Sequence, residues 1–120
     1  MREQMLKSIL SDLNGSSADI EASAIISADG LTMAALLPQD VDEDRGGAMA
    51  AAMLALGERT ARELNRGDLD QVMVKGNNGY ILMSYAGHDA VLTVIAKEGA
   101  KLGLIFLDAK RAAKNIVDIL

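Results

Sequence analysis

The segment from Asp68 to Leu120 places the tightest constraint on what this chain can fold into. It holds three short apolar runs, DQVMVKG, YILMSYAG and AVLTVIA, separated by Asn77-Asn78-Gly79 and by Gly87-His88-Asp89. Turn residues that tolerate a positive φ, at this spacing, favour antiparallel hairpins over parallel pairing. The run beginning AKLGLIFLDAKRAA then repeats apolar residues with a helical period. The pattern predicts a three-stranded meander closed by an amphipathic helix.

The first part of the chain predicts a helix followed by a hairpin. Apolar residues recur with a helical period over residues 2–13, and Asn14-Gly15-Ser16-Ser17 is typical of a helix end. Two further apolar runs, Ile20–Ser27 and Leu31–Leu37, flank Ala28-Asp29-Gly30, which is a strong hairpin signal.

The middle of the chain predicts a helix with an unusual surface. From Gly46 to Gly57 it reads GGAMAAAMLALG, with no charged side chain on any side. A helix that is apolar all round is buried on more than one side, and its own sheet covers only one. We therefore expect the opposite side to meet the same helix of a second copy, in a homodimer.

The apolar runs also predict that both faces of the sheet are covered, because they are nearly continuous rather than alternating. The expected element order is α-β-β-α-β-β-β-α, in one domain over residues 1–120. The fold class is α+β, a three-layer α/β/α sandwich on a five-stranded antiparallel sheet. The middle helix is expected on one face and the two terminal helices on the other.

Composition argues against several classes of function. The net charge is −5, and no basic run exceeds Lys110-Arg111, so nucleic acid is not an expected partner. Cysteine is absent, which excludes disulfides and thiol chemistry. The N-terminus lacks an apolar signal core, and no run approaches the length of a bilayer span. We expect a cytoplasmic protein without membrane insertion.

No pattern of catalytic residues emerges, so an enzyme, a cofactor and a metal site are not expected. The acidic run Asp40–Asp44 resembles a calcium loop, but Arg45 and Ala51 stand where glycine and glutamate are required. Capping of the middle helix by Asp42 or Asp44 explains the run better. His88, the single histidine, reads as a turn residue, and Gly76–Gly79 reads as a hairpin turn rather than a phosphate loop.

Three arginines near the end of the middle helix, Arg59, Arg62 and Arg66, leave two interpretations open. One of them could face a partner and stabilise a transferring phosphoryl group, as an arginine finger does. Alternatively, they balance the helix dipole and pair with Glu58 and Glu63.

Over nearly its whole length the chain resembles the roadblock/LC7 (dynein light chain roadblock-type) family, which has a profilin-like fold. The resemblance rests on ASAIISADGLTMAA, on DVDEDRGGAMAAAM, and on the stretch from Asp68 to Ala113, with Leu102-Gly103-Leu104 opening the last helix. It implies a dimer in which the central helices pack antiparallel and the third strands join two sheets into one of ten strands. Mapped onto this chain, the interface residues are Gly46, Met49, Ala50, Met53, Gly57, Leu69, Val72 and Val74.

The resemblance also implies a function carried out through surfaces. Roadblock proteins attach to dynein, scaffold signalling complexes or regulate small Ras-like GTPases, and are not themselves nucleotide hydrolases. We therefore expect a homodimeric, non-catalytic regulator of a Ras-like small GTPase. A structural adaptor without nucleotide dependence is the alternative. A small-molecule sensor is a weaker third interpretation, since this core offers one Phe and little polarity.

Overall fold

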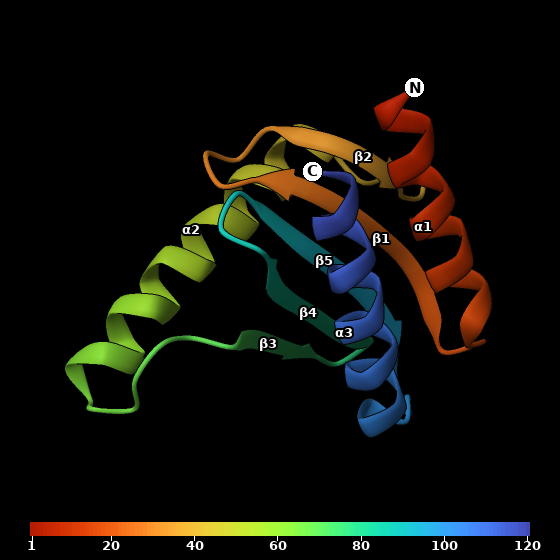
Figure 1. Cartoon of the computed structure of the whole chain (residues 1–120). Helices are drawn as coiled ribbons and strands as arrows, with labels where there is room; N and C mark the ends of the chain where they lie inside the picture. Colours follow the sequence, from red (N-terminus) through yellow and green to blue (C-terminus); the bar gives the residue numbers. More distant parts are fainter.

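The computed structural model describes all 120 residues and confirms the expected element order. The elements are α1 (Arg2–Ser16), β1 (Ile20–Ser27), β2 (Thr32–Leu36), α2 (Glu43–Glu63), β3 (Gln71–Gly76), β4 (Gly79–Ala86), β5 (Ala90–Lys97) and α3 (Leu102–Ile119). Figure 1 shows α2 on one side of the sheet and the terminal helices on the other. The predicted three-layer α/β/α sandwich is therefore confirmed.

The sheet is entirely antiparallel, with the strand order β2-β1-β5-β4-β3. The first hairpin and the meander are joined by the pairing of β1 with β5, and the edges are β2 and β3. Gly79, after the β3–β4 turn, has φ +141°. A Cβ there would collide with the carbonyl oxygen of Ala96, so this turn depends on glycine.

The larger core lies between the sheet and the pair α1 and α3. Leu6 and Leu10 of α1 and Ile105 and Ile116 of α3 are fully buried there. The two helices are antiparallel, since Ser16 at the end of α1 donates a hydrogen bond to Asp108 early in α3. Each buried Leu or Ile side chain contributes about 1.5–3 kcal/mol, so this face carries most of the stability.

A smaller core lies between α2 and the other face of the sheet. Its buried members are Ala24, Ile26, Ala50, Leu54, Met83 and Val91. The first turns of α2 lie close to the β1–β2 hairpin, because a Cβ on Gly47 would stand 2.8 Å from the carbonyl oxygen of Gly30. This close approach needs glycine, so the helix is held tightly at its start.

The boundaries differ from the sequence-based expectation at a few points. The helix α1 continues through Asn14 and Gly15 to Ser16, three residues beyond the predicted end. The side chain of Asn14 explains its place in the helix, since it accepts a 2.6 Å hydrogen bond from the buried hydroxyl of Ser23. No helix in the structure is long and apolar enough to cross a membrane.

Candidate functional site

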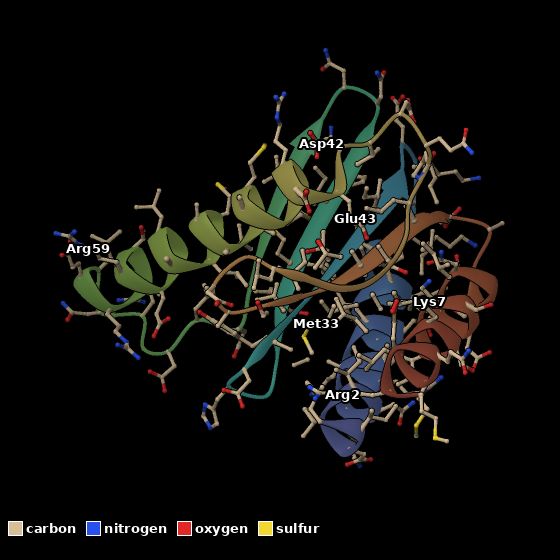
Figure 2. All side chains as sticks on the ribbon, turned by 90° about the horizontal axis from the view of Figure 1, so that it is seen from above. Arg2, Lys7, Met33, Asp42, Glu43 and Arg59 are labelled. Carbon is tan, nitrogen blue, oxygen red and sulfur yellow. The ribbon has the colours of Figure 1, made fainter.

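The main exposed apolar feature on this side of the sheet lies along α2. The side chains of Met49, Met53, Leu56 and Leu64 recur at spacings of four, three and eight residues and form what we call the α2 stripe. Met49 is 60% exposed, Leu56 61% and Leu64 65%. Figure 2 shows α2 on the opposite side of the sheet from Arg2 and Lys7 of α1. A helix of soluble proteins normally turns charged residues outward, so this stripe is a candidate interaction surface.

The start of α2 explains why the acidic run precedes it. Asp42 is the N-cap, and its side chain accepts a 3.1 Å hydrogen bond from the backbone N–H of Arg45. Glu43 and Asp44 lie in the first turn, where they oppose the positive end of the helix dipole. Of the two predicted capping residues, the structure therefore selects Asp42.

Two of the residues assigned to an interface from the sequence lie against the protein's own sheet. Ala50 is 3% exposed and belongs to the core beneath α2, so it lies outside the exposed surface. A Cβ on Gly57 would lie 2.7 Å from Cγ2 of Val72, which shows that this glycine faces the third strand of its own sheet. Small residues on α2 therefore serve close contact with the sheet as well as exposure.

The other predicted interface residues lie on or near one continuous surface. Met49, Met53 and Val74 are exposed, while Gly46, Leu69 and Val72 are half-buried. A shallow groove of about 410 Å³ runs between the α2 stripe and the start of β3, lined by Met53, Leu56, Gly57, Thr60, Ala61, Leu64, Arg66, Leu69, Gln71 and Val72. Leu56 lies within the range Gly46 to Gly57 that the family resemblance assigns to the interface, whereas Leu64 was not predicted from the sequence.

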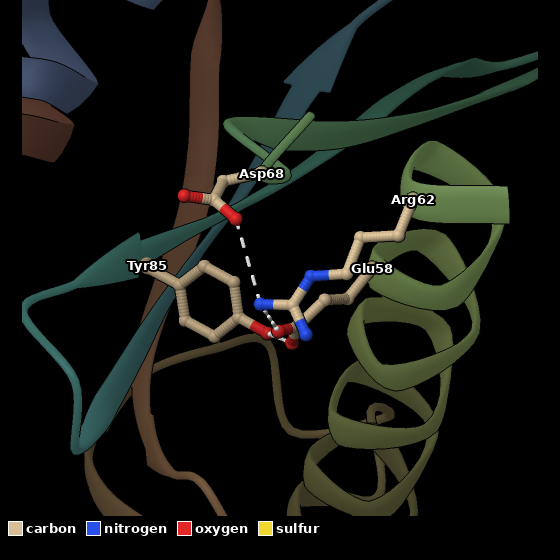
Figure 3. A network of polar contacts seen from close by, with 4 residues as sticks. All are labelled: Glu58, Arg62, Asp68 and Tyr85. Atoms are coloured by element: carbon tan, nitrogen blue, oxygen red, sulfur yellow. Dashed lines mark hydrogen bonds and ion pairs between the residues drawn. The ribbon is translucent and has the colours of Figure 1, made fainter. Parts of the chain in front are cut away.

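A polar network ties the far half of α2 to the sheet (Figure 3). The hydroxyl of Tyr85 donates a 2.8 Å hydrogen bond to Oε2 of Glu58, and Nη2 of Arg62 lies 2.8 Å from Oε1 of Glu58. The same guanidinium nitrogen lies 3.5 Å from Oδ1 of Asp68 in the α2–β3 connection. These four side chains fix the angle between α2, β4 and that connection.

The network forms one wall of a cavity of about 540 Å³ beneath α2. Its apolar lining includes Leu54, Leu69 and Val91. Beside this cavity α2 still meets the sheet, since Gly57 lies close to Val72 of β3. The network adds polar contacts to this packing, from α2 to β4 and to the α2–β3 connection.

All three arginines have partners within the chain. Nε of Arg59 lies 2.9 Å from Oε1 of Glu63, Arg62 belongs to the network, and Nε of Arg66 donates to the carbonyl oxygen of Leu64 at 3.2 Å. Glu58 pairs with Arg62 and Glu63 with Arg59, each four positions away, as the dipole-and-pairing interpretation predicts. Arg59 remains 76% exposed at its side chain.

No group of three His, Cys, Asp or Glu side chains is arranged to hold a metal ion.

Burial and the hydrogen bond to Glu58 raise the pKa of Tyr85 above its ordinary value of 10.0. The folded state therefore keeps this proton at a pH where the unfolded state has lost it, so unfolding becomes easier as pH rises above about 10. We expect Tyr85→Phe to remove this part of the high-pH loss of stability, while costing about 1 kcal/mol at pH 7. Denaturant unfolding at pH 7 to 11 measures both effects.

The matched control is Tyr80→Phe, which leaves Tyr85 and its network in place. This variant should keep the high-pH loss of stability of the wild-type protein. An equal loss above pH 10 in Tyr85→Phe and in the wild type would show that the network does not hold the proton.

The chain is similar in sequence to a known protein family and to proteins of known sequence. The family model described as Roadblock/LC7 domain matches residues 6–96. The uncharacterised protein MJ1340 of Methanocaldococcus jannaschii is 40% identical over 112 residues, covering 93% of this chain and 96% of that protein.

Solved structures share the fold at lower identity. The gliding protein MglB from Thermus thermophilus superposes with a TM-score of 0.87 at 20% identity, covering 98% of this chain and 90% of the other. A structure described as MglB with tetrameric arrangement gives 0.89 at 20% identity, covering 98% and 89%. Profilin II of Acanthamoeba castellanii gives 0.64 at 17% identity, covering 92% and 95%, which agrees with the expected profilin-like fold. The chain belongs to the roadblock/LC7 domain family.

Proposed function

We propose that this protein is a homodimer that binds and regulates a Ras-like small GTPase without catalysing a reaction itself. The observation that carries the proposal is the α2 stripe, an apolar helix face that no part of its own chain covers. Large exposed apolar patches on a small soluble domain mark surfaces that bind another protein.

A second copy of the chain suits the α2 stripe for geometric reasons. The stripe is interspersed with Ala48, Ala52 and Ala55, which are also exposed and let a second helix approach closely. In a two-fold dimer the same surface serves on both sides, and an axis perpendicular to α2 would pack it antiparallel to its copy. Small side chains at such a contact favour the short end of the usual 8–10 Å between helix axes.

The third strand supports the same arrangement. β3 is an edge strand, so one row of its backbone N–H and C=O groups lacks a strand partner. Val74 on β3 and Ile81 beside it on β4 are exposed on the α2 face of the sheet. Pairing of β3 with its copy would cover this edge and extend the interface from α2 to the sheet.

A GTPase as the regulated partner is inferred from membership of the roadblock/LC7 family. The exposed guanidinium of Arg59, together with Arg66 near the end of α2, is the surface we assign to that partner. Regulation would follow from differential binding: a dimer that contacts one nucleotide state better shifts the switch loops of the GTPase toward that state.

We expect Met53→Asp to dissociate the dimer, because it places a carboxylate at the centre of the α2 contact. The cost should be about 3 kcal/mol or more, on the order of a hundredfold in the dimer dissociation constant. Light scattering over a dilution series measures this directly. Leu104→Asp is the matched control, since Leu104 is an exposed apolar residue on α3, away from the proposed contact. If Met53→Asp and Leu104→Asp weaken association equally, the dimer interface does not lie on α2.

The regulatory claim is tested with a purified Ras-like GTPase from the same genome, loaded with GDP or with a non-hydrolysable GTP analogue. We expect the dimer to bind one nucleotide state at least about tenfold more tightly, as calorimetry would measure. Arg59→Glu should weaken this binding without changing the mass of the dimer. Equal affinity for both states would contradict regulation and favour a structural adaptor.

A further inference from the structure

One region of the sheet is covered by no helix on the side of α1 and α3. Those two helices pack against β1, β2, β4 and β5, and the edge strand β3 lies beyond them, as Figure 1 shows. On this side β3 presents Gln71, Met73 and Lys75, which are exposed, and Met73 is 42% exposed. We call this uncovered strip and the adjoining side of α3 the trough.

The trough has an apolar floor and one apolar wall. Met73 of β3 pairs with the buried Leu82 of β4, and Phe106 and Ala113 of α3 are half-buried beside the strand. A hollow of about 490 Å³ lies at this wall, lined by Phe106 and Ala113 together with Ser84 and Gln71. A surface of this kind, apolar at its base and walled by a helix, suits the apolar face of another helix.

The width of the trough follows from the proposed dimer, on which this inference rests. If β3 pairs with its copy, the two α3 helices stand three to four strand spacings apart, or about 14–19 Å. Packed helices need 8–10 Å between axes, so one helix between the two α3 helices needs about 16–20 Å and two need about 24–30 Å. The upper part of the roughly 14–19 Å range admits one helix, and no part of it admits two. The two-fold axis runs through the middle of this gap, so each dimer offers one site.

The charges at the trough indicate what the helix carries on its polar side. The chain as a whole has a net charge of −5. Lys110 nevertheless lines the hollow, and Nζ of Lys75 lies 5.8 Å from the centre of the Tyr80 ring on the floor. Asp70 is the one carboxylate lining the hollow. A dimer would therefore present four lysines and two aspartates around one groove.

We propose that the trough binds one amphipathic helix of a partner protein, whose polar side is acidic, per dimer. The site is on the opposite side of the sheet from the α2 surface assigned to the GTPase. The dimer would thus hold two different partners on its two faces at once.

The test uses two labelled peptides of about 20 residues with the same leucine and alanine stripe. One carries glutamate on its polar side and the other carries lysine. By fluorescence anisotropy we expect the glutamate peptide to bind one per dimer, at least about tenfold more tightly than the lysine peptide. The double variant Lys75→Glu/Lys110→Glu should reverse this preference. Arg111→Glu, on the side of α3 that faces α1, is the control and should leave it unchanged.

Three results would overturn the proposal: equal binding of the two peptides, one peptide bound per chain, or an effect of Arg111→Glu as large as that of the double variant. Light scattering of each protein shows whether it is a dimer, which separates a failure of the trough proposal from a failure of the dimer proposal. A wild-type protein that is monomeric overturns both the dimer and the trough. A dimer that does not prefer the acidic helix overturns the trough alone.

Discussion

The sheet has apolar side chains on both faces, and only three helices are available to cover them. Two helices and the larger core occupy one face, while α2 alone covers the other. The exposed side of α2 and the uncovered side of β3 both follow from this unequal division. Because α2 must bury one side against the sheet and yet is apolar all round from Gly46 to Gly57, an apolar side is left exposed. On the opposite face, α1 and α3 stop short of β3.

The contact between α2 and the sheet changes along the helix. At its start, Gly47 lies against the β1–β2 hairpin with no room for a side chain. Further along, Gly57 lies close to Val72 of β3, and the network around Glu58 and Arg62 lines a cavity of about 540 Å³ beside this contact. Partly exposed ion pairs contribute little to stability on their own. A hydrogen-bonded network of this kind instead specifies geometry, here the direction in which the α2 stripe faces.

Most of the architecture could be predicted from the sequence because its signals are local. Apolar runs, hairpin residues and helical periodicity placed all eight elements, with small errors such as the end of α1 at Ser16. The side of α2 on which a given alanine or glycine lies was not predictable in the same way. Ala50 and Gly57 carry no polar group that would mark them as inward or outward, so their contacts depend on how the helix is rotated on the sheet.

The polar network was beyond sequence reasoning for another reason. Tyr85 and Glu58 are 27 residues apart and come from different layers. Their spacing in the sequence does not predict the hydrogen bond, which forms because α2 lies close to the end of β4 in the fold. The pairing of Arg59 with Glu63 was predictable, because residues four apart on a helix are neighbours. Tertiary contacts between polar residues were thus missed, whereas those within one helix were anticipated.

In the proposed dimer, two copies of the chain meet through the middle of α2 in an antiparallel arrangement. The chain has no cysteine, so single cysteines can be introduced and spin-labelled without competing sites. Pulsed electron paramagnetic resonance on Met53→Cys and Arg45→Cys measures the distance between the two labelled copies. We predict a short backbone separation of about 8–10 Å at residue 53 and a longer one of about 25 Å at residue 45, from the helix rise and the axis spacing. A separation at residue 45 shorter than at residue 53, or no coupling between copies at either position, would contradict the account.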